Sequence, residues 1–194
     1  MVALAGLGAG ALHVVSGPDH LAALGPVAAR APERAVGLGA LWGVGHGVGV
    51  LLIAGLARLG GSALDLASLS GWAEVAVGVV LVILGFRALR RVHDRTTHDH
   101  PVAVRSALGV GLLHGAAGAH HLFVVLPSLL LEPAQAALYL GAYLVAAVLA
   151  MACAGGLVAL GMRGRGSGAR VAIHRALGAA ALLTGVVWIG VSLG

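Results

Sequence analysis

Long apolar stretches alternate with short polar gaps along the whole chain. Six of these stretches approach the ~20 residues that a helix needs to cross a bilayer. They cover residues 2–27, 36–58, 72–90, 104–130, 135–161 and 171–193. The pattern therefore predicts an all-α integral membrane protein with six transmembrane helices.

Composition supports this class. Hydrophobic residues make up 59% of the chain and charged residues 10%, against about 25% charged residues in an ordinary soluble domain. The 32 glycines suit close packing between helices in lipid. The first ten residues have no basic start, so they read as part of the first span rather than a signal peptide. Cys153 is the single cysteine, which argues against a disulfide framework and a thiol relay.

The basic residues predict an orientation. All are arginines, and all but Arg58 lie in or beside three gaps, 28–35, 92–103 and 162–170. The positive-inside rule makes these gaps cytoplasmic loops and places both termini outside. The expected location is the plasma (inner) membrane, crossed several times. The net charge of +5 therefore reflects membrane topology and not a nucleic-acid partner.

The chain also contains an internal repeat. Residues Gly8–Pro26 align without a gap with Gly109–Pro127, at an offset of 101. The matched pairs include His13 with His114, His20 with His121, and Pro26 with Pro127, while Asp19 meets His120.

The repeat predicts how the chain is divided. Residues 1–91 form a first three-helix repeat, 92–103 a His-rich cytoplasmic loop, and 104–194 a second three-helix repeat. Because each repeat has an odd number of spans, the second is inverted relative to the first. Inverted repeats are typical of transporters, whose site lies near the midplane where the halves meet.

Ionisable residues gather at apparent membrane depth. His13 and His20 are seven residues apart, about 700° around a helix, so they share a face, and His114 and His121 repeat the spacing. An aspartate at that depth costs about 2.5 kcal/mol or more, so it normally faces a cavity or a partner. The candidate metal ligands are His13, Asp19, His20, His46, His114, His120 and His121.

The residue types indicate which ions fit. Imidazole suits Zn, Ni, Cu and Fe, whereas Mg²⁺ and Ca²⁺ prefer oxygen ligands, which are scarce here. His46 on its own is more typical of a hydrogen bond between helices than of a metal ligand. Of His120 and His121, one points elsewhere, because neighbours differ by about 100° around a helix.

Backbone signals predict a break in the first span. Pro18 lacks an N–H and clashes with the carbonyl of Val14, and Gly17 adds freedom. We expect the helix to kink or break here, with Ser16 capping a second half that begins near Pro18. An ordinary proline kink without a ligand role is the alternative.

Glycines in the second span predict close packing. Gly39, Gly43 and Gly47 recur every four residues, as do Gly45 and Gly49. Such spacing lets neighbouring helices approach closely, which would hold His46 against the site.

Histidines outside the spans are ambiguous. The loop from His93 to His100 carries three histidines and two aspartates, and it is either a transient metal site or a solvated loop. His174 is expected at the surface.

Three segments together carry a resemblance to a known family. They are LHVVSGPDHLAAL, LWGVGHGVG and GLLHGAAGAHHLFVVLP. The chain resembles the nickel/cobalt transporter superfamily, most closely its six-span branch related to the urease-accessory nickel permeases. The resemblance implies Ni²⁺ or Co²⁺ as transported substrate, with His13, Asp19, His20 and His46 as the functional positions. Five residues separate His13 from Asp19 here, whereas the classical permeases have four.

The sequence thus predicts a transporter rather than an enzyme. A divalent transition-metal ion, Ni²⁺ or Co²⁺ first and Zn²⁺ after them, would pass by alternating access, with no prosthetic group. The expected partners are that ion and the lipid bilayer, with a homo-oligomer and a metallochaperone at the cytoplasmic face as candidates. The alternatives are an intramembrane His-ligated di-iron oxidoreductase and a haem-binding membrane protein. The identity of the metal, import or export, and the coupling ion stay open.

Overall fold

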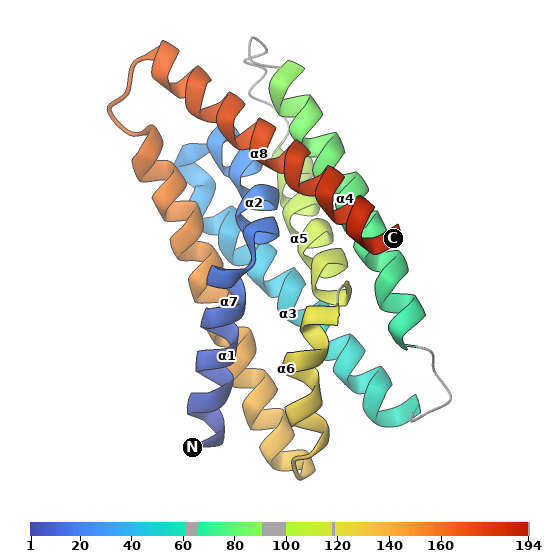
Figure 1. Cartoon of the computed structure of the whole chain (residues 1–194). Helices are drawn as coiled ribbons and strands as arrows, with labels where there is room; N and C mark the ends of the chain where they lie inside the picture. Colours follow the sequence, from blue (N-terminus) through green and yellow to red (C-terminus); the bar gives the residue numbers. More distant parts are fainter. Residues whose placement is uncertain (61–65, 91–99, 118, 194) are drawn as a thin grey trace.

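The structure is a computed structural model that describes residues 1–60, 66–90, 100–117 and 119–193, without the side chains of 66, 67, 69, 70, 100–104 and 119–123. Every regular element in this part of the chain is helical (Figure 1). The elements are α1 (Val2–Ser16), α2 (Pro18–Arg30), the 3₁₀ turn η1 (Pro32–Arg34), α3 (Ala35–Gly60), α4 (Leu66–Arg90), α5 (His100–Ala116), α6 (Ala119–Leu129), α7 (Pro133–Met162) and α8 (Ser167–Leu193).

Four segments are long and apolar enough to cross a membrane. They are Pro32–Gly60, Gly71–Arg90, Pro133–Met162 and Ser167–Leu193. The expected spans 2–27 and 104–130 are each divided into two shorter helices. With 15 residues, α1 is only ~22 Å long, less than the ~30 Å hydrocarbon core, so it cannot cross alone. In Figure 1, α1 continues into α2 and α5 into α6 along the length of the bundle.

The break in the first span lies at Gly17. This residue is extended (φ −88°, ψ 103°), and Pro18 begins α2 as its first helical residue, as predicted. The prediction that Ser16 caps this helix is wrong. Gly17 is the residue directly before α2, and no side chain caps the helix. Ser16 lies one residue too early, and its hydroxyl donates back to the His13 carbonyl at 3.4 Å.

The long helix α3 runs through the middle of the bundle, between α5 and α7. Its glycines form the two predicted faces. A Cβ on Gly39 or Gly43 would contact the α7 backbone, whereas one on Gly45 or Gly49 would contact the α5 backbone. This close packing sets the position of His46, which lies among these glycines.

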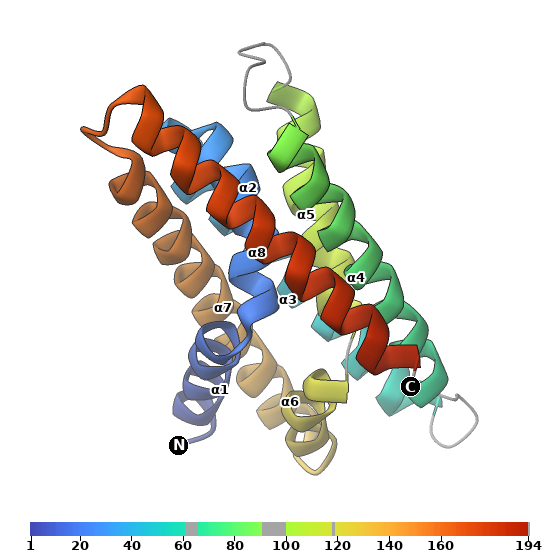
Figure 2. The ribbon, with the colours of Figure 1, turned by 45° about the horizontal axis from the view of Figure 1, so that its top comes forward.

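The remaining helices pack in pairs. α1 lies along α7, α4 crosses α8, and α2 lies beneath α8, as Figures 1 and 2 show from two directions. Glycines form the α4–α8 contact as well. A Cβ on Gly78 would approach the carbonyl of Gly185, and one on Gly185 would approach the carbonyl of Gly78.

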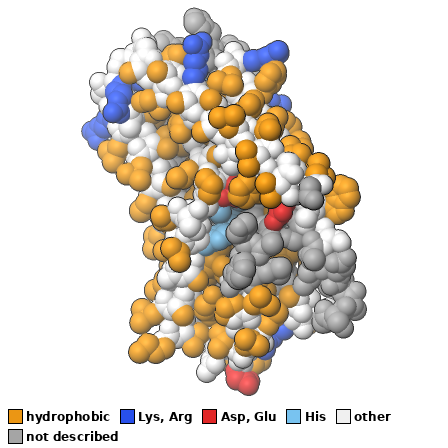
Figure 3. All heavy atoms as spheres, viewed as in Figure 1, with side chains coloured by type: hydrophobic (Ala, Val, Ile, Leu, Met, Phe, Trp, Pro, Cys, Tyr) orange, Lys and Arg blue, Asp and Glu red, His pale blue; other side chains and the backbone are white. Residues whose placement is uncertain are grey.

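Polarity is distributed as in a membrane protein. Large hydrophobic side chains face outward, including Leu12 (69% exposed) and Val191 (77% exposed), while Asp19 and three histidines are buried. Arginines gather at one end, at the top of Figure 3. At the opposite end, Arg58 donates to the carbonyls of Ser128 and Leu131 and ties α3 to the last turn of α6 and to the residues that follow it. The apolar helices therefore indicate association with a membrane.

Candidate metal centre

The structure brings five of the predicted ligands together in one buried cluster. Three of their ligand atoms, from His13, His20 and His46, lie within 4.8 Å of one another. A second set with the same spacing consists of Asp19, His20 and His114. His20 belongs to both sets and is therefore the centre of the cluster.

The break at Gly17 shapes the cluster. His13 lies before the break and His20 after it, yet their Nε2 atoms are 3.1 Å apart. A Cβ on Gly17 would overlap Nδ1 of His20 and approach Oδ1 of Asp19. Glycine is thus required here because the imidazole and the carboxylate lie directly against the backbone.

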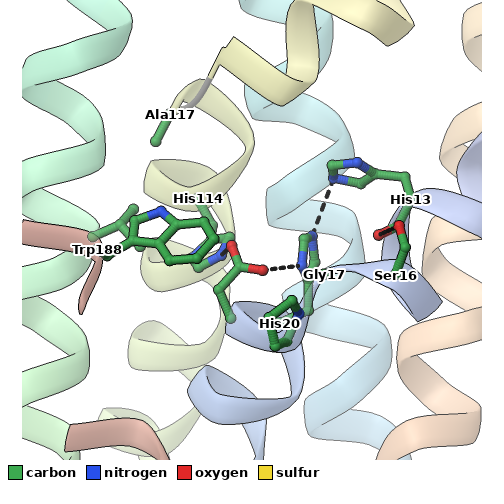
Figure 4. A pocket seen from close by; sticks show the side chains of 10 residues that line it. His13, Ser16, Gly17, His20, His114, Ala117 and Trp188 are labelled. Carbon is green, nitrogen blue, oxygen red and sulfur yellow. Dashed lines mark hydrogen bonds and ion pairs between the residues drawn. The ribbon is translucent and has the colours of Figure 1, made fainter. Parts of the chain in front are cut away.

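Hydrogen bonds connect four of these side chains in a row (Figure 4). His20 Nδ1 lies 3.0 Å from Asp19 Oδ1, and His114 Nε2 lies 2.7 Å from Asp19 Oδ2. Each carboxylate oxygen therefore accepts from one imidazole. If His20 donates its Nδ1–H to Asp19, its Nε2 accepts the Nε2–H of His13. The order His13, His20, Asp19, His114 leaves the negative charge compensated by two donors.

Burial makes these contacts strong. His20 and His114 are 2% exposed, His46 is fully buried, and Asp19 is 7% exposed. Asp19 also lies in the first turn of α2, where the N-terminal end of the helix dipole favours a negative charge. Electrostatic attraction between this carboxylate and a cation is screened little at such depth.

Aromatic side chains hold His46 in place. Its ring stacks on Trp42 (5.1 Å between centroids, 11° between planes) and on His13 (5.2 Å, 24°). Its Nε2 lies 3.1 Å from the hydroxyl of Tyr143 on α7. A histidine with this much support has one fixed orientation, which is typical of a ligand position.

Two buried polar atoms beside the cluster have no hydrogen-bond partner among the described residues. They are Nε1 of Trp42 and Nδ1 of His114. Unsatisfied buried atoms are costly and are typical of sites that take up an ion or water.

A cavity of about 100 Å³ opens beside the cluster. The residues that line the cavity include His13, Asp19, His20, His114, Val77 and Trp188. Histidine side chains are visible in a hollow on the face shown in Figure 3, with acidic side chains close to them. Such a volume accommodates an ion with a few water molecules.

The geometry fits a divalent transition-metal ion. Two ligands at the 2.0–2.1 Å typical of zinc and imidazole are about 3.3 Å apart in a tetrahedral site, close to the 3.1 Å between Nε2 of His13 and Nε2 of His20. An ion placed between them would replace the proton that they share. Several imidazoles with one carboxylate favour Zn, Cu or Fe over Mg²⁺ or Ca²⁺.

The remaining predicted ligands are not placed in the cluster. His120 and His121 lie in the first turn of α6, and their side chains lie outside the described residues. The same holds for the loop from His93 to His100, of which only the backbone of His100, at the start of α5, is described. His174 is half buried in α8 and belongs to neither set.

Sequence reasoning missed Trp42 and Tyr143. They are 101 residues apart, the offset of the repeat, and each is approached by a repeat-related glycine. Gly111 packs against the carbonyl of Trp42, and a Cβ on Gly10 would lie 2.5 Å from the carbonyl of Tyr143. Extending the offset of 101 past Pro127 would have aligned these two residues.

Removing the Tyr143 hydroxyl should weaken metal binding. We expect Tyr143→Phe to lower the affinity for Zn²⁺ about 10- to 100-fold, the usual effect of losing a hydrogen bond that orients a ligand histidine. Calorimetric titration of the purified protein in detergent measures this. Tyr139→Phe, one turn earlier on α7, is the matched control and should bind like the wild type. Equal affinities for all three proteins would show that His46 is not a ligand.

Two curated plant proteins are similar to part of this chain. It is 39% identical over 87 residues to Chloroplast protein FOR GROWTH AND FERTILITY 1 of Arabidopsis thaliana. It is 37% identical over 90 residues to Chloroplast protein FOR GROWTH AND FERTILITY 2 of the same plant. The matches cover 44% and 46% of this chain but 24% of each relative, so the chain spans about a quarter of their length. No family model matches the chain, and no solved structure matches it.

These comparisons overturn the resemblance to the nickel/cobalt transporter superfamily. The matching relatives are chloroplast proteins named for growth and fertility, and no family model of nickel/cobalt permeases matches. The motif behind the resemblance has one residue more between His13 and Asp19 than the permease pattern. One inserted residue turns a helix by about 100°, and the break at Gly17 lies within this interval. The assignment to Ni²⁺ or Co²⁺ transport is wrong and is not kept.

Proposed function

We propose that this protein binds a divalent first-row transition-metal ion at the cluster around His20 and passes it across a membrane. The observation that carries the proposal is the burial of Asp19, His20 and His114 inside apolar helices, where contacts of 2.7–3.1 Å join them to the partly buried His13. The buried His46 stacks against His13. Ionisable residues at such depth usually mark an ion pathway. The adjacent cavity offers access to the cluster.

We propose six membrane crossings, arranged as two inverted repeats. The two broken helices support it, because α2 begins at Pro18 and α6 at Ala119, which are 101 residues apart. Reciprocal glycine contacts support it further. A Cβ on Gly85 would contact the carbonyl of Gly178, and one on Gly178 would approach that of Gly85. A two-fold relation between the halves is the basis of alternating access in other transporters.

We propose that the arginine-rich end faces the compartment in which the chain is made. This follows from the gathering of arginines at one end of the bundle (Figure 3). The matched relatives are named as chloroplast proteins. A chloroplast-type membrane is therefore better supported than the plasma membrane expected from the sequence.

The alternatives considered from sequence have less support. Di-iron sites in helical bundles use several carboxylates, whereas the described cluster contains only Asp19. A cavity of about 100 Å³ is smaller than the 300–1,000 Å³ typical of pockets for larger organic ligands, so a haem has little room. Neither an enzyme nor a haem protein explains the paired histidines better than an ion pathway.

Flux into liposomes tests the proposal. Purified protein is reconstituted with a metal-sensitive dye inside the vesicles, and Mn²⁺, Fe²⁺, Zn²⁺ and Cu²⁺ are added separately. At least one ion should enter faster than into empty liposomes, and Asp19→Asn should reduce that rate at least about tenfold, because the carboxylate compensates part of the ion's charge. No flux above empty liposomes for any ion would contradict a transport function.

Binding should weaken in acid. Protons and metal ions compete for the same imidazole nitrogens, so a bound ion displaces protons. Imidazole takes up a proton near pH 6.5, and we expect Zn²⁺ affinity to fall about tenfold or more per unit below pH 6. Competition with a chelator of known pH dependence measures this. Affinity independent of pH between 5 and 8 would indicate that imidazoles are not the ligands.

A further inference from the structure

A second carboxylate lies within the apolar helices, near the cavity. Glu74 is in α4, inside the apolar stretch Gly71–Arg90, and its side chain is only partly exposed. A carboxylate at such a position is costly and is usually retained for a function. Sequence reasoning counted Asp19 as the carboxylate at membrane depth and did not use Glu74.

Contacts place Glu74 one helical turn from the cavity lining. Val77, three residues further along α4, lines the cavity, and so does Trp188 on α8. Ser192 follows Trp188 by one turn, and its hydroxyl lies 3.2 Å from Oε2 of Glu74 and 2.8 Å from the Trp188 carbonyl. Glu74 thus lies on α4 and contacts α8, the two helices that form one wall of the cavity.

The direction of this turn matters. α4 runs toward the arginine-rich end, where Arg87 and Arg90 lie in its last turn, so Glu74 lies on the arginine-poor side of Val77. A cation that approaches the cavity from that side meets a carboxylate before it meets the cluster. A negative charge in a cleft with low-dielectric walls raises the local concentration of cations and their rate of entry.

We propose that Glu74 recruits divalent cations at the arginine-poor mouth of the cavity and delivers them to the His20 cluster. This inference rests on the proposed function of the cluster. Glu74 acts in entry and is not a ligand of the deep site. Removing the carboxylate of Glu74 should therefore change the rate at which ions arrive. It should not change the affinity of the cluster for the ion.

The test compares Glu74→Gln with the wild type in two assays. In liposomes with Zn²⁺ added at the arginine-poor side, we expect the KM of flux to rise about tenfold with the maximal rate unchanged. In detergent, equilibrium Zn²⁺ affinity should change less than twofold. Glu74→Asp should restore most of the KM, and Ser192→Ala, which keeps the carboxylate, should stay within about threefold of the wild type.

The outcomes separate this inference from the function that it rests on. An unchanged KM in Glu74→Gln, or a parallel loss of maximal rate and equilibrium affinity, would overturn the role of Glu74 while leaving the cluster as the ion site. A wild-type protein without flux or binding would overturn both. A raised KM that Glu74→Asp does not restore would also count against recruitment by charge.

Discussion

His20→Ala is expected to abolish metal binding by the purified protein. His20 belongs to both ligand sets and contacts both His13 and Asp19. Its loss removes a ligand and separates the remaining ones, so Zn²⁺ affinity should fall more than about 100-fold, beyond the effect typical of losing an outer partner. Calorimetric titration in detergent, with Zn²⁺ as the probe, gives the affinity.

His174→Ala is the control for this variant, because His174 lies in α8 outside both ligand sets. It should bind Zn²⁺ like the wild type. A His20→Ala protein that folds and binds with unchanged affinity would contradict the proposed site, and equal losses in both variants would point to non-specific binding.

Gly115→Ala should destabilise the bundle and weaken binding together. A Cβ at this position would contact the carbonyl of His46 and lie 2.7 Å from its carbonyl carbon and 2.9 Å from its Cα. These are backbone atoms, so α3 and α5 must move apart. Overpacking of this kind typically costs about 1–3 kcal/mol, and the movement would separate His46 from His114. Thermal unfolding and Zn²⁺ affinity, measured on the same preparation, report both effects.

Gly109→Ala is a matched control on the same helix, because nothing lies within 4 Å of the position of its Cβ. Alanine favours a helix over glycine by about 1 kcal/mol, so this variant should be as stable as the wild type or slightly more. If Gly115→Ala behaved like Gly109→Ala, the close contact between α3 and α5 would be wrong.

The sequence predicted much of the packing because the signals were local. The glycine spacing in residues 36–58 predicted both faces of α3, and Pro18 predicted where α2 begins. The seven-residue spacing predicted that His13 and His20 share one helix face, but the structure places them on two helices, α1 and α2. A continuous helix would place both on one face, whereas here the break at Gly17 brings their Nε2 atoms to 3.1 Å.

Contacts between distant residues could not be predicted in this way. Tyr143 reaches His46 across 97 positions of sequence, and Ser192 reaches Glu74 across 118. Such pairs depend on how whole helices cross, and a short polar motif does not predict the crossing of distant helices. Hydropathy also did not predict that the expected spans 2–27 and 104–130 are each divided into two helices, because an interruption of one or two residues barely changes the mean hydropathy of a segment.

The incorrect assignment to the nickel/cobalt transporter superfamily has a physical explanation. A histidine followed by an Asp-His pair in an apolar segment supplies ligands that suit many transition metals. The motif around His13, Asp19 and His20 therefore indicates a kind of chemistry, and it does not identify a particular family or ion. The similarity to the two chloroplast proteins covers less than half of the chain.

X-ray absorption at the zinc edge tests most directly whether the imidazoles around His20 hold a divalent transition-metal ion. The sample is protein loaded with one equivalent of Zn²⁺ and then desalted. We expect at least two imidazole nitrogens at about 2.0–2.1 Å from the zinc, and their loss in His20→Ala. Zinc surrounded by oxygen alone, or an identical spectrum in the variant, would contradict a metal site at these imidazoles.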